Sequence, residues 1–264
     1  MPAFWHMILY NVASVSPSDF PLRFRFPTML VTLIKSQFAA SCVAAIAVFV
    51  VLAIPGRVRG DETSGSEAVV TDSKIVFQED FESGLGAWEL LDPKTWELKE
   101  SDGNHTLAIT ARESEYVPPV RSPFHVALIK DLELESVEIS FRVRSTLDTG
   151  NHRDCCVFFN YMDDQHFYYV HLGAKPDPHS GQIMIVNEAP RLALTTNENR
   201  TPWDDKWHQV RVVRTVSTGA IDIHFDDMET PHLHVIDKTF TKGRVGIGSF
   251  DDMNEFDDVV VRAR

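Results

Sequence analysis

The segment from Arg142 to His171 concentrates side chains that can act on a polar ligand. The candidate ligand-binding residues among its guanidinium, imidazole, phenol and amide side chains are Arg142, Arg144, His152, Asn160, His166, Tyr168, Tyr169 and His171. Such groups bond hydroxyls and carboxylates, while aromatic rings stack on the apolar faces of sugars. An arginine beside a tyrosine or histidine also suits the removal and return of a proton. The segment therefore predicts ligand binding, proton transfer or, if the rings only fill a core, a structural role.

Strands must position this segment. In VEISFRVRS, residues 137–145, apolar and polar side chains alternate, which is typical of a half-buried strand. If the apolar set faces the core, Arg142 and Arg144 project from the other face, into a cleft or into solvent. The apolar runs 155–161 and 166–173 are separated by MDDQ, a stretch of hairpin-loop length, so they are expected to pair.

Short runs of this kind recur along residues 74–264, joined by clusters of Gly, Pro, Asn and Asp. Their spacing of about 8 to 12 residues favours an all-β sandwich or barrel over an α/β fold. No window of about a dozen residues has the apolar periodicity of an amphipathic helix.

The order of four phrases resembles that of concanavalin A-like lectin/glucanase jelly rolls, which include laminin G-like modules and domains similar to 3-keto-disaccharide hydrolases. The phrases are FQEDFESGLGAWEL, CCVFFNYMDDQHFYYVHL, KWHQVRVVRT followed by GAIDIHFDD, and GRVGIGSFDDMNEFDDVVVR. The resemblance covers residues 74–264. It implies a two-sheet antiparallel jelly-roll β-sandwich, and a concave sheet face that receives carbohydrate in many relatives.

The resemblance also implies a structural calcium ion where the first and last strands meet. Asp80 and Glu82 lie in the first predicted strand region, and Asp257 and Asp258 lie on the last strand. Calcium takes six to eight oxygen ligands, which carboxylates and backbone carbonyls supply. These four acids are the predicted metal ligands.

The function expected from these features is binding or processing of a glycan on the concave face, by the Arg142–His171 cluster and Trp203, whose loop (RTPWDDK) suggests an exposed ring. Trp207 is expected to be buried. A polysaccharide lyase or keto-sugar glycoside hydrolase acting on the same face is an alternative. The chain lacks the Gln-x-His and Tyr-x-Lys motifs of alginate lyases and the Glu-x-Asp-x-x-Glu motif of glucanases, so no catalytic residue is assigned. A laminin G-like protein-protein adhesion module is the third hypothesis.

The N-terminal residues predict export. Residues 38–54 form an apolar run without charge, preceded by Lys35 and followed by GRVRG, which is typical of a secretory signal peptide. Residues 1–60 are therefore interpreted as a targeting segment, with Met29 as an alternative start, and residues 61–73 as a linker. The expected location is secreted or periplasmic. An uncleaved run would be long enough to anchor the chain in a membrane.

Charge excludes one class of partner. Residues 61–264 hold 20 basic and 37 acidic side chains, a formal charge of −17. Nucleic-acid binding depends largely on cations that replace counterions along the phosphate backbone. DNA and RNA are therefore not expected ligands.

Cys155 and Cys156 are the only cysteines after residue 60. Neighbouring residues on a strand point to opposite faces, so a shared disulfide would strain the peptide and two thiolates could not aim at one metal ion. The sequence predicts two small, buried or half-buried free thiols and no disulfide framework.

Overall fold

The computed structural model describes residues 73–264. The predicted targeting segment, the alternative start at Met29 and nearly all of the predicted linker lie outside these residues. Within them, no helix has the length and apolar character that a membrane span requires.

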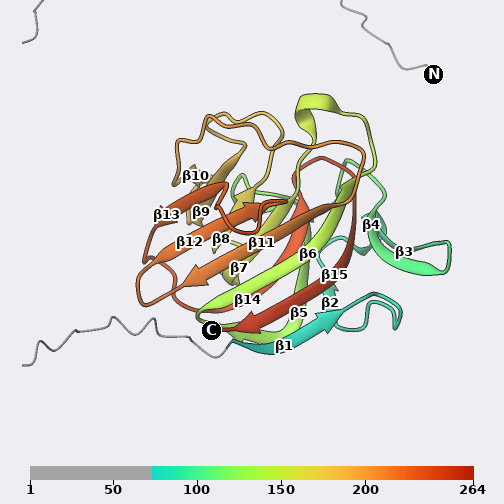
Figure 1. Cartoon of the computed structure of the whole chain (residues 1–264), viewed down its shortest axis with the longest axis horizontal. Helices are drawn as coiled ribbons and strands as arrows, with labels where there is room; N and C mark the ends of the chain where they lie inside the picture. The colour runs from blue at the N-terminus through green and yellow to red at the C-terminus, as the bar shows by residue number, and fades with distance from the viewer. Residues whose placement is uncertain (1–72) are drawn as a thin grey trace, which may run out of the picture. The chain divides into compact units, whose positions relative to one another are not determined.

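Fifteen strands and two short 3-10 helices make up the described part of the chain (Figure 1). Their bounds are β1 (Lys74–Glu79), β2 (Trp88–Leu90), η1 (Pro93–Thr95), β3 (Trp96–Ser101), β4 (Asn104–Ile109), β5 (His125–Leu134), β6 (Val137–Ser145), η2 (Gly150–His152), β7 (Cys156–Asp163), β8 (His166–His171), β9 (Gln182–Asn187), β10 (Leu192–Ala193), β11 (His208–Thr215), β12 (Ala220–Phe225), β13 (Leu233–Ile236), β14 (Gly243–Ser249) and β15 (Asn254–Ala263). The expected all-β composition is confirmed.

The strands form two antiparallel sheets. Sheet A has the order β13-β12-β11-β6-β15-β4-β3, and β1 also pairs with β15. Sheet B has the order β10-β9-β8-β7-β14-β5-β2. The two sheets overlie one another in Figure 1, and one hydrophobic cluster draws residues from both. The predicted two-sheet antiparallel β-sandwich is therefore confirmed.

The core lies between the sheets and follows the alternation in the sequence. In β6 the apolar residues of VEISFRVRS all face inward and are at most 2% exposed, as Val137, Ile139, Phe141 and Val143. From sheet B, β7 and β8 contribute Val157, Phe159, Tyr168 and Val170. Each fully buried large apolar side chain contributes roughly 1.5–3 kcal/mol relative to exposure. The pairing of β7 with β8 confirms the predicted hairpin.

The outer faces of the two sheets differ. Sheet A has a partly exposed polar outer face, whereas the outer face of sheet B carries a second buried cluster, made of Val126, Leu128, Cys156, Phe158, Tyr161, Phe167, Tyr169, Met184 and Val186. Leu91, Val120 and Ala193 pack against this cluster from outside sheet B or at its edge. Strands buried on both faces have continuous apolar runs instead of alternation, which is what the sequence of β7, β8 and β9 shows. The middle of this face is therefore closed, and any opening must lie at its ends.

The prediction that the two cysteines are free thiols, buried or half-buried, is confirmed. Both are free and buried. Cys155 belongs to the core between the sheets, and Cys156 belongs to the cluster on the outer face of sheet B.

Candidate functional site

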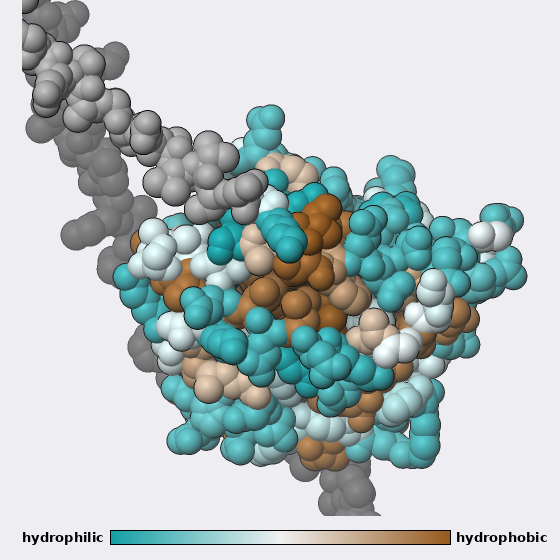
Figure 2. Space-filling view, turned by 90° about the horizontal axis from the view of Figure 1, so that it is seen from below, coloured by the Kyte–Doolittle hydropathy of each residue, from teal (hydrophilic) through white to brown (hydrophobic). Residues whose placement is uncertain are grey.

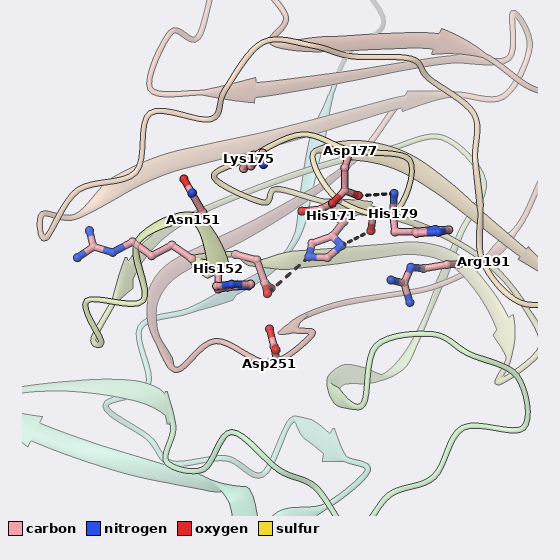
Figure 3. A pocket seen from close by; sticks show the side chains of 11 residues that line it. Asn151, His152, His171, Lys175, Asp177, His179, Arg191 and Asp251 are labelled. Atoms are coloured by element: carbon pink, nitrogen blue, oxygen red, sulfur yellow. Dashed lines mark hydrogen bonds and ion pairs between the residues drawn. The ribbon is translucent and has the colours of Figure 1, made fainter. Parts of the chain in front are cut away.

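A pocket of about 300 Å³ opens where β7 begins and β8 ends, beside η2 (Figure 3). It is lined by Asn151, His152, Arg153, Asp154, His171, Lys175, Asp177, His179, Ser180, Arg191 and Asp251. All of these side chains are polar or charged. The pocket lies at the end of the outer face of sheet B, beyond the part closed by the second cluster.

His171 is fixed from several directions. It is the last residue of β8 and is 6% exposed. Its Nδ1 lies 2.9 Å from the carbonyl oxygen of His179, and since a carbonyl only accepts, Nδ1 donates. Its ring stacks on Phe250 at 5.6 Å between centroids. Its Nε2 therefore points to Asp154, whose Oδ2 lies 3.5 Å away.

Asp154 is buried just before β7 and is held as firmly as His171. Its Oδ1 accepts hydrogen bonds from Ser249 Oγ at 2.8 Å and from the Phe250 amide at 3.0 Å. Its backbone carbonyl accepts one from Asn254 Nδ2 at 2.9 Å. Burial alone would raise the pKa of Asp154, but the charge of His171 and these hydrogen bonds hold that pKa below its ordinary value.

A second buried carboxylate lies beside it. Asp252 Oδ2 accepts from Ser145 Oγ at 2.7 Å and from the Asp154 amide at 3.3 Å. Burial, joined by the negative charge of Asp154, raises the pKa of Asp252 to about 6. Within residues 73–264, no lysine or arginine nitrogen lies within 4.0 Å of either carboxylate. Two buried carboxylates thus lie side by side, and one of them, Asp154, lines the pocket.

The rim of the pocket offers cations. Arg191 lies with its guanidinium carbon 4.3 Å from the centroid of Phe250, and its Nε and Nη1 are buried without a hydrogen-bond partner. Lys175 is exposed. In the described part of the chain neither has a carboxylate within 4.0 Å. The rim acids are already engaged, since Asp177 accepts from the His179 amide and Asp251 pairs with Arg112.

The structure brings only some of the predicted site residues to this pocket. His152 and His171 line it, and the ring of Tyr169 lies 6.4 Å from that of His171, beneath the pocket. Arg142 and Arg144 lie on the outer face of sheet A, where they pair with carboxylates of β15. The predicted cluster is therefore divided between two sheets.

Asn160 and Tyr168 face the interior, so they have no surface with which to meet a ligand. Asn160 donates to the carbonyls of Leu134 and Glu135 and accepts from Arg214. The Tyr168 hydroxyl donates to an Asp237 carboxylate oxygen. Both residues stabilise the fold, which corrects the prediction that they bind a ligand.

His166 lies at the start of β8, whereas the pocket opens at its end. Its Nδ1 lies 2.7 Å from Asp163 Oδ1, and this hydrogen bond raises the pKa of His166. The His166 imidazole is therefore engaged in the β7–β8 turn, away from the pocket.

Both tryptophans are half-buried, whereas Trp203 was predicted to be exposed and Trp207 to be buried. Trp203 donates its Nε1–H to the carbonyl of Leu172 at 2.7 Å and packs edge-on against Phe225, although it also borders a second hollow beside the pocket. Trp207 is half-buried on the outer face of sheet A, with the guanidinium carbons of Arg142 and Arg144 at 5.1 and 5.0 Å from its ring centroid. Trp207 faces outward because the side chains that point inward from the adjoining strand β11 are those of even-numbered residues.

The predicted calcium ligands are engaged elsewhere. β1 and β15 do pair, as expected. However, Arg142 binds Asp257 and Asp258, and Glu82 binds the amide and Nδ1 of His105, which lowers the pKa of Glu82. Asp80 Oδ1 accepts from the Glu82 amide. Calcium coordination by these four acids gains no support from this arrangement.

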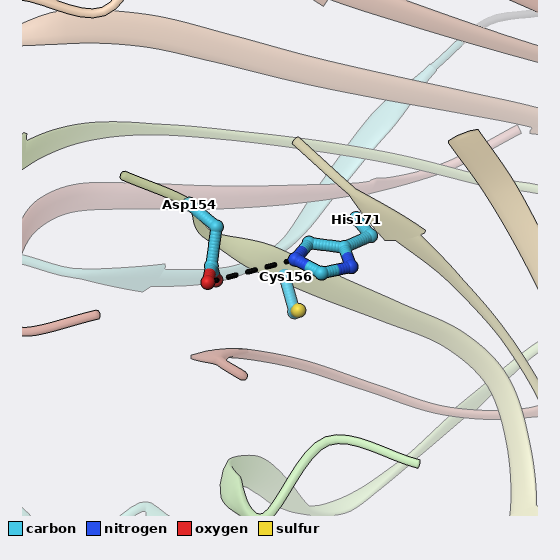
Figure 4. A group of neighbouring side chains, drawn as sticks. All are labelled: Asp154, Cys156 and His171. Atoms are coloured by element: carbon cyan, nitrogen blue, oxygen red, sulfur yellow. Dashed lines mark ion pairs between the residues drawn. The ribbon is translucent and has the colours of Figure 1, made fainter. Parts of the chain in front are cut away.

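In the described part of the chain, a different group of side chains lies close enough together to hold a metal ion. One ligand atom each from Asp154, Cys156 and His171 lies within 4.8 Å of the other two (Figure 4). Asp154 was not among the predicted site residues, and Cys156 was predicted only as a buried or half-buried free thiol. In an extended segment, residues two apart point to the same side, and this spacing was the available signal.

No family model matches the chain, and no curated protein matches it. Solved structures similar to it include the carbohydrate-binding module CBM66 from Bacillus subtilis (14% identity, TM-score 0.47, covering 66% of this chain and 93% of that one). Another is the winged bean acidic lectin complexed with methyl-α-D-galactose (14% identity, TM-score 0.46, covering 72% of this chain and 98% of that one). A third is the lectin from Bauhinia forficata in complex with GalNAc (10% identity, TM-score 0.45, covering 72% of this chain and 97% of that one). At these identities the similarity concerns the arrangement of strands in the sandwich.

Proposed function

We propose that this domain binds an acidic carbohydrate in the pocket at the end of sheet B. The observation that carries the proposal is the pair of rim cations, Lys175 and Arg191, which have no carboxylate within 4.0 Å in the described residues. His152, His179 and Asn151 surround them with donors and acceptors suited to sugar hydroxyls. The apolar segment 38–54 supports the further proposal that the protein works outside the cytoplasm.

The charge distribution indicates a small acidic group and not a long polyanion. An arginine fork binds a carboxylate or sulfate through two parallel hydrogen bonds. Arg191 is already oriented by its contact with Phe250, so little side-chain freedom is lost on binding. The strongly acidic remainder of the domain repels extended polyanions. A uronate or a sulfated sugar fits both conditions.

Recognition is favoured over a lyase or keto-sugar hydrolase reaction. The lyase hypothesis requires Arg142 or Arg144 beside a histidine and a tyrosine at one reacting centre. Arg142 and Arg144 lie on the outer face of the other sheet. The Tyr169 hydroxyl is buried without a hydrogen-bond partner, and burial raises its pKa well above the ordinary value. A phenol in that state is a poor proton acceptor near neutral pH.

The test is titration calorimetry of the full chain with uronate-containing, sulfated and neutral oligosaccharides, with and without calcium. We expect the acidic sugars to bind. Arg191→Gln should weaken that binding about 10- to 100-fold, because a charge-assisted hydrogen bond is worth about 1.5–3 kcal/mol. The matched control is Arg121→Gln, since Arg121 also lies over Phe250 but is exposed and does not line the pocket.

Three outcomes would contradict the proposal. Equal weakening by both variants would show that the Phe250 contact matters and the pocket does not. Release of unsaturated sugar products would make the protein a lyase. Absence of binding to every glycan would favour a protein partner, for which Figure 2 shows a candidate surface, because hydrophobic residues gather at the centre of that face within a hydrophilic rim.

A further inference from the structure

Asp154, Cys156 and His171 lie together beneath the pocket and are almost fully buried, at 3%, 0% and 6% exposure. They present a carboxylate oxygen, a sulfur and an imidazole nitrogen, all within 4.8 Å of one another (Figure 4). Two of them, Asp154 and His171, also line the pocket. The group is therefore enclosed by the protein on one side and borders the pocket on the other.

The distance between the imidazole nitrogen and the carboxylate oxygen suits a tetrahedral ion. Two ligands about 2.1 Å from a tetrahedral metal ion are about 3.4 Å apart. Asp154 Oδ2 and His171 Nε2 are separated by 3.5 Å, which is long for a direct hydrogen bond. Their separation therefore fits two ligands of one metal ion better than it fits a direct hydrogen bond between them.

The groups behind the ligands match those of metal sites. A metal-binding histidine usually donates its other ring N–H to a carbonyl or carboxylate, and binding carboxylates are themselves hydrogen-bonded. His171 Nδ1 donates to the His179 carbonyl, and the second oxygen of Asp154 accepts from Ser249 and the Phe250 amide. Both ligands are thus held in place before any ion arrives.

A bound cation would also compensate the negative charge of the buried carboxylates in and beside the group. Asp154 and Asp252 are buried side by side, and within residues 73–264 no lysine or arginine nitrogen lies within 4.0 Å of them. Buried carboxylates are ordinarily paired or bound to metal. The nearest basic group is His171, at 3.5 Å from Asp154.

We propose that Asp154, Cys156 and His171 bind a divalent transition-metal ion of the zinc class. One sulfur, one nitrogen and one carboxylate oxygen suit Zn²⁺, whereas Ca²⁺ takes oxygen ligands almost exclusively. The thiol proton of Cys156 leaves to solvent when the metal–sulfur bond forms. The fourth position faces the pocket, where water or an oxygen of a bound molecule completes the tetrahedron. This inference stands independently of the carbohydrate proposal.

The test uses the full chain without a histidine tag, stripped with a chelator and titrated with Zn²⁺ by calorimetry and with Co²⁺ by absorption spectroscopy. We expect one equivalent to bind and Co²⁺ to give a sulfur-to-metal charge-transfer band. Cys156→Ser should abolish that band, and both Cys156→Ser and His171→Gln should weaken Zn²⁺ binding by more than about 100-fold, since even outer-shell changes cost 10- to 100-fold.

The matched control is Cys155→Ser, because this neighbouring thiol is equally buried but faces the core between the sheets. It should keep the charge-transfer band and the stoichiometry. If the Cys156 variant unfolds, the His171 variant and the rise in melting temperature of the wild-type chain with Zn²⁺ still test the site. No binding to the wild-type chain, or equal binding to the Cys156 and Cys155 variants, would overturn the proposal.

Discussion

Replacing Arg214 with methionine is expected to lower the free energy of unfolding by about 4 kcal/mol. Arg214 is fully buried in β11, and it donates through Nε to Asn160 Oδ1 at 3.1 Å. Its Nη1 donates to the carbonyls of Gly219 and Asp237 at 2.7 and 2.8 Å, and its Nη2 to that of Phe240 at 2.9 Å. Methionine fills a similar volume but removes the donor from Asn160 Oδ1 and from the carbonyls of Asp237 and Phe240, while the Gly219 carbonyl keeps the Asp237 amide as a donor at 2.9 Å. Urea unfolding followed by fluorescence measures the loss.

Two further variants make the result specific to the guanidinium. Arg214→Lys keeps the charge but cannot reproduce the planar fork of donors, so it should still cost most of the stability. Arg262→Met is the control, because Arg262 is partly exposed on β15 and lies 3.9 Å from Glu138; its effect should stay within about 0.5 kcal/mol. A loss below about 1 kcal/mol for Arg214→Met would contradict the argument.

Gly248→Ala is expected to cost more than about 3 kcal/mol, at the upper end of overpacking effects. A Cβ at Gly248 would lie 1.9 Å from the carbonyl oxygen and 2.9 Å from the carbonyl carbon of His125. The obstacle is backbone of the paired strand β5, which cannot rotate away. Thermal unfolding should show a loss of roughly 6–12 °C for a domain of this size.

Gly86→Ala provides the comparison for Gly248→Ala. Nothing lies within 4 Å of a Cβ at Gly86, so the same methyl group should change the melting temperature by little. Equal melting temperatures for the two variants would show that β14 and β5 can separate without a measurable cost.

The sandwich could be predicted because its strands leave clear patterns in the sequence. Alternation in residues 137–145 marks a sheet with one exposed face, and unbroken apolar runs such as HFYYV mark a sheet buried on both faces. The assignment of faces failed where the pattern breaks. Asn160 adopts a positive φ of 44° at an irregularity in the β7–β8 pairing, which turns its amide toward Arg214. No periodicity in the sequence reveals such a residue.

The pocket was only partly predictable. Asp154 lies two residues before Cys156, the first residue of β7, but His171 joins them only because β8 pairs with β7 in the register that sets Cys156 opposite His171. Phe250, which covers His171, is almost 80 residues further along the chain. Such convergence depends on tertiary packing, and no local pattern in the sequence encodes it.

The position of β14 and β15 has a consequence for how the domain is made. β14 lies between β5 and β7 in sheet B, and β15 joins β6 to β4 and β1 in sheet A. Both interior strands are the last of the domain to leave the ribosome. Hairpins such as β7–β8 can form during synthesis, but sheet B cannot close until β14 has emerged, and sheet A cannot close until β15 has emerged. Assembly is therefore expected to follow translation of the whole domain, at the slow rates typical of folds dominated by long-range pairing.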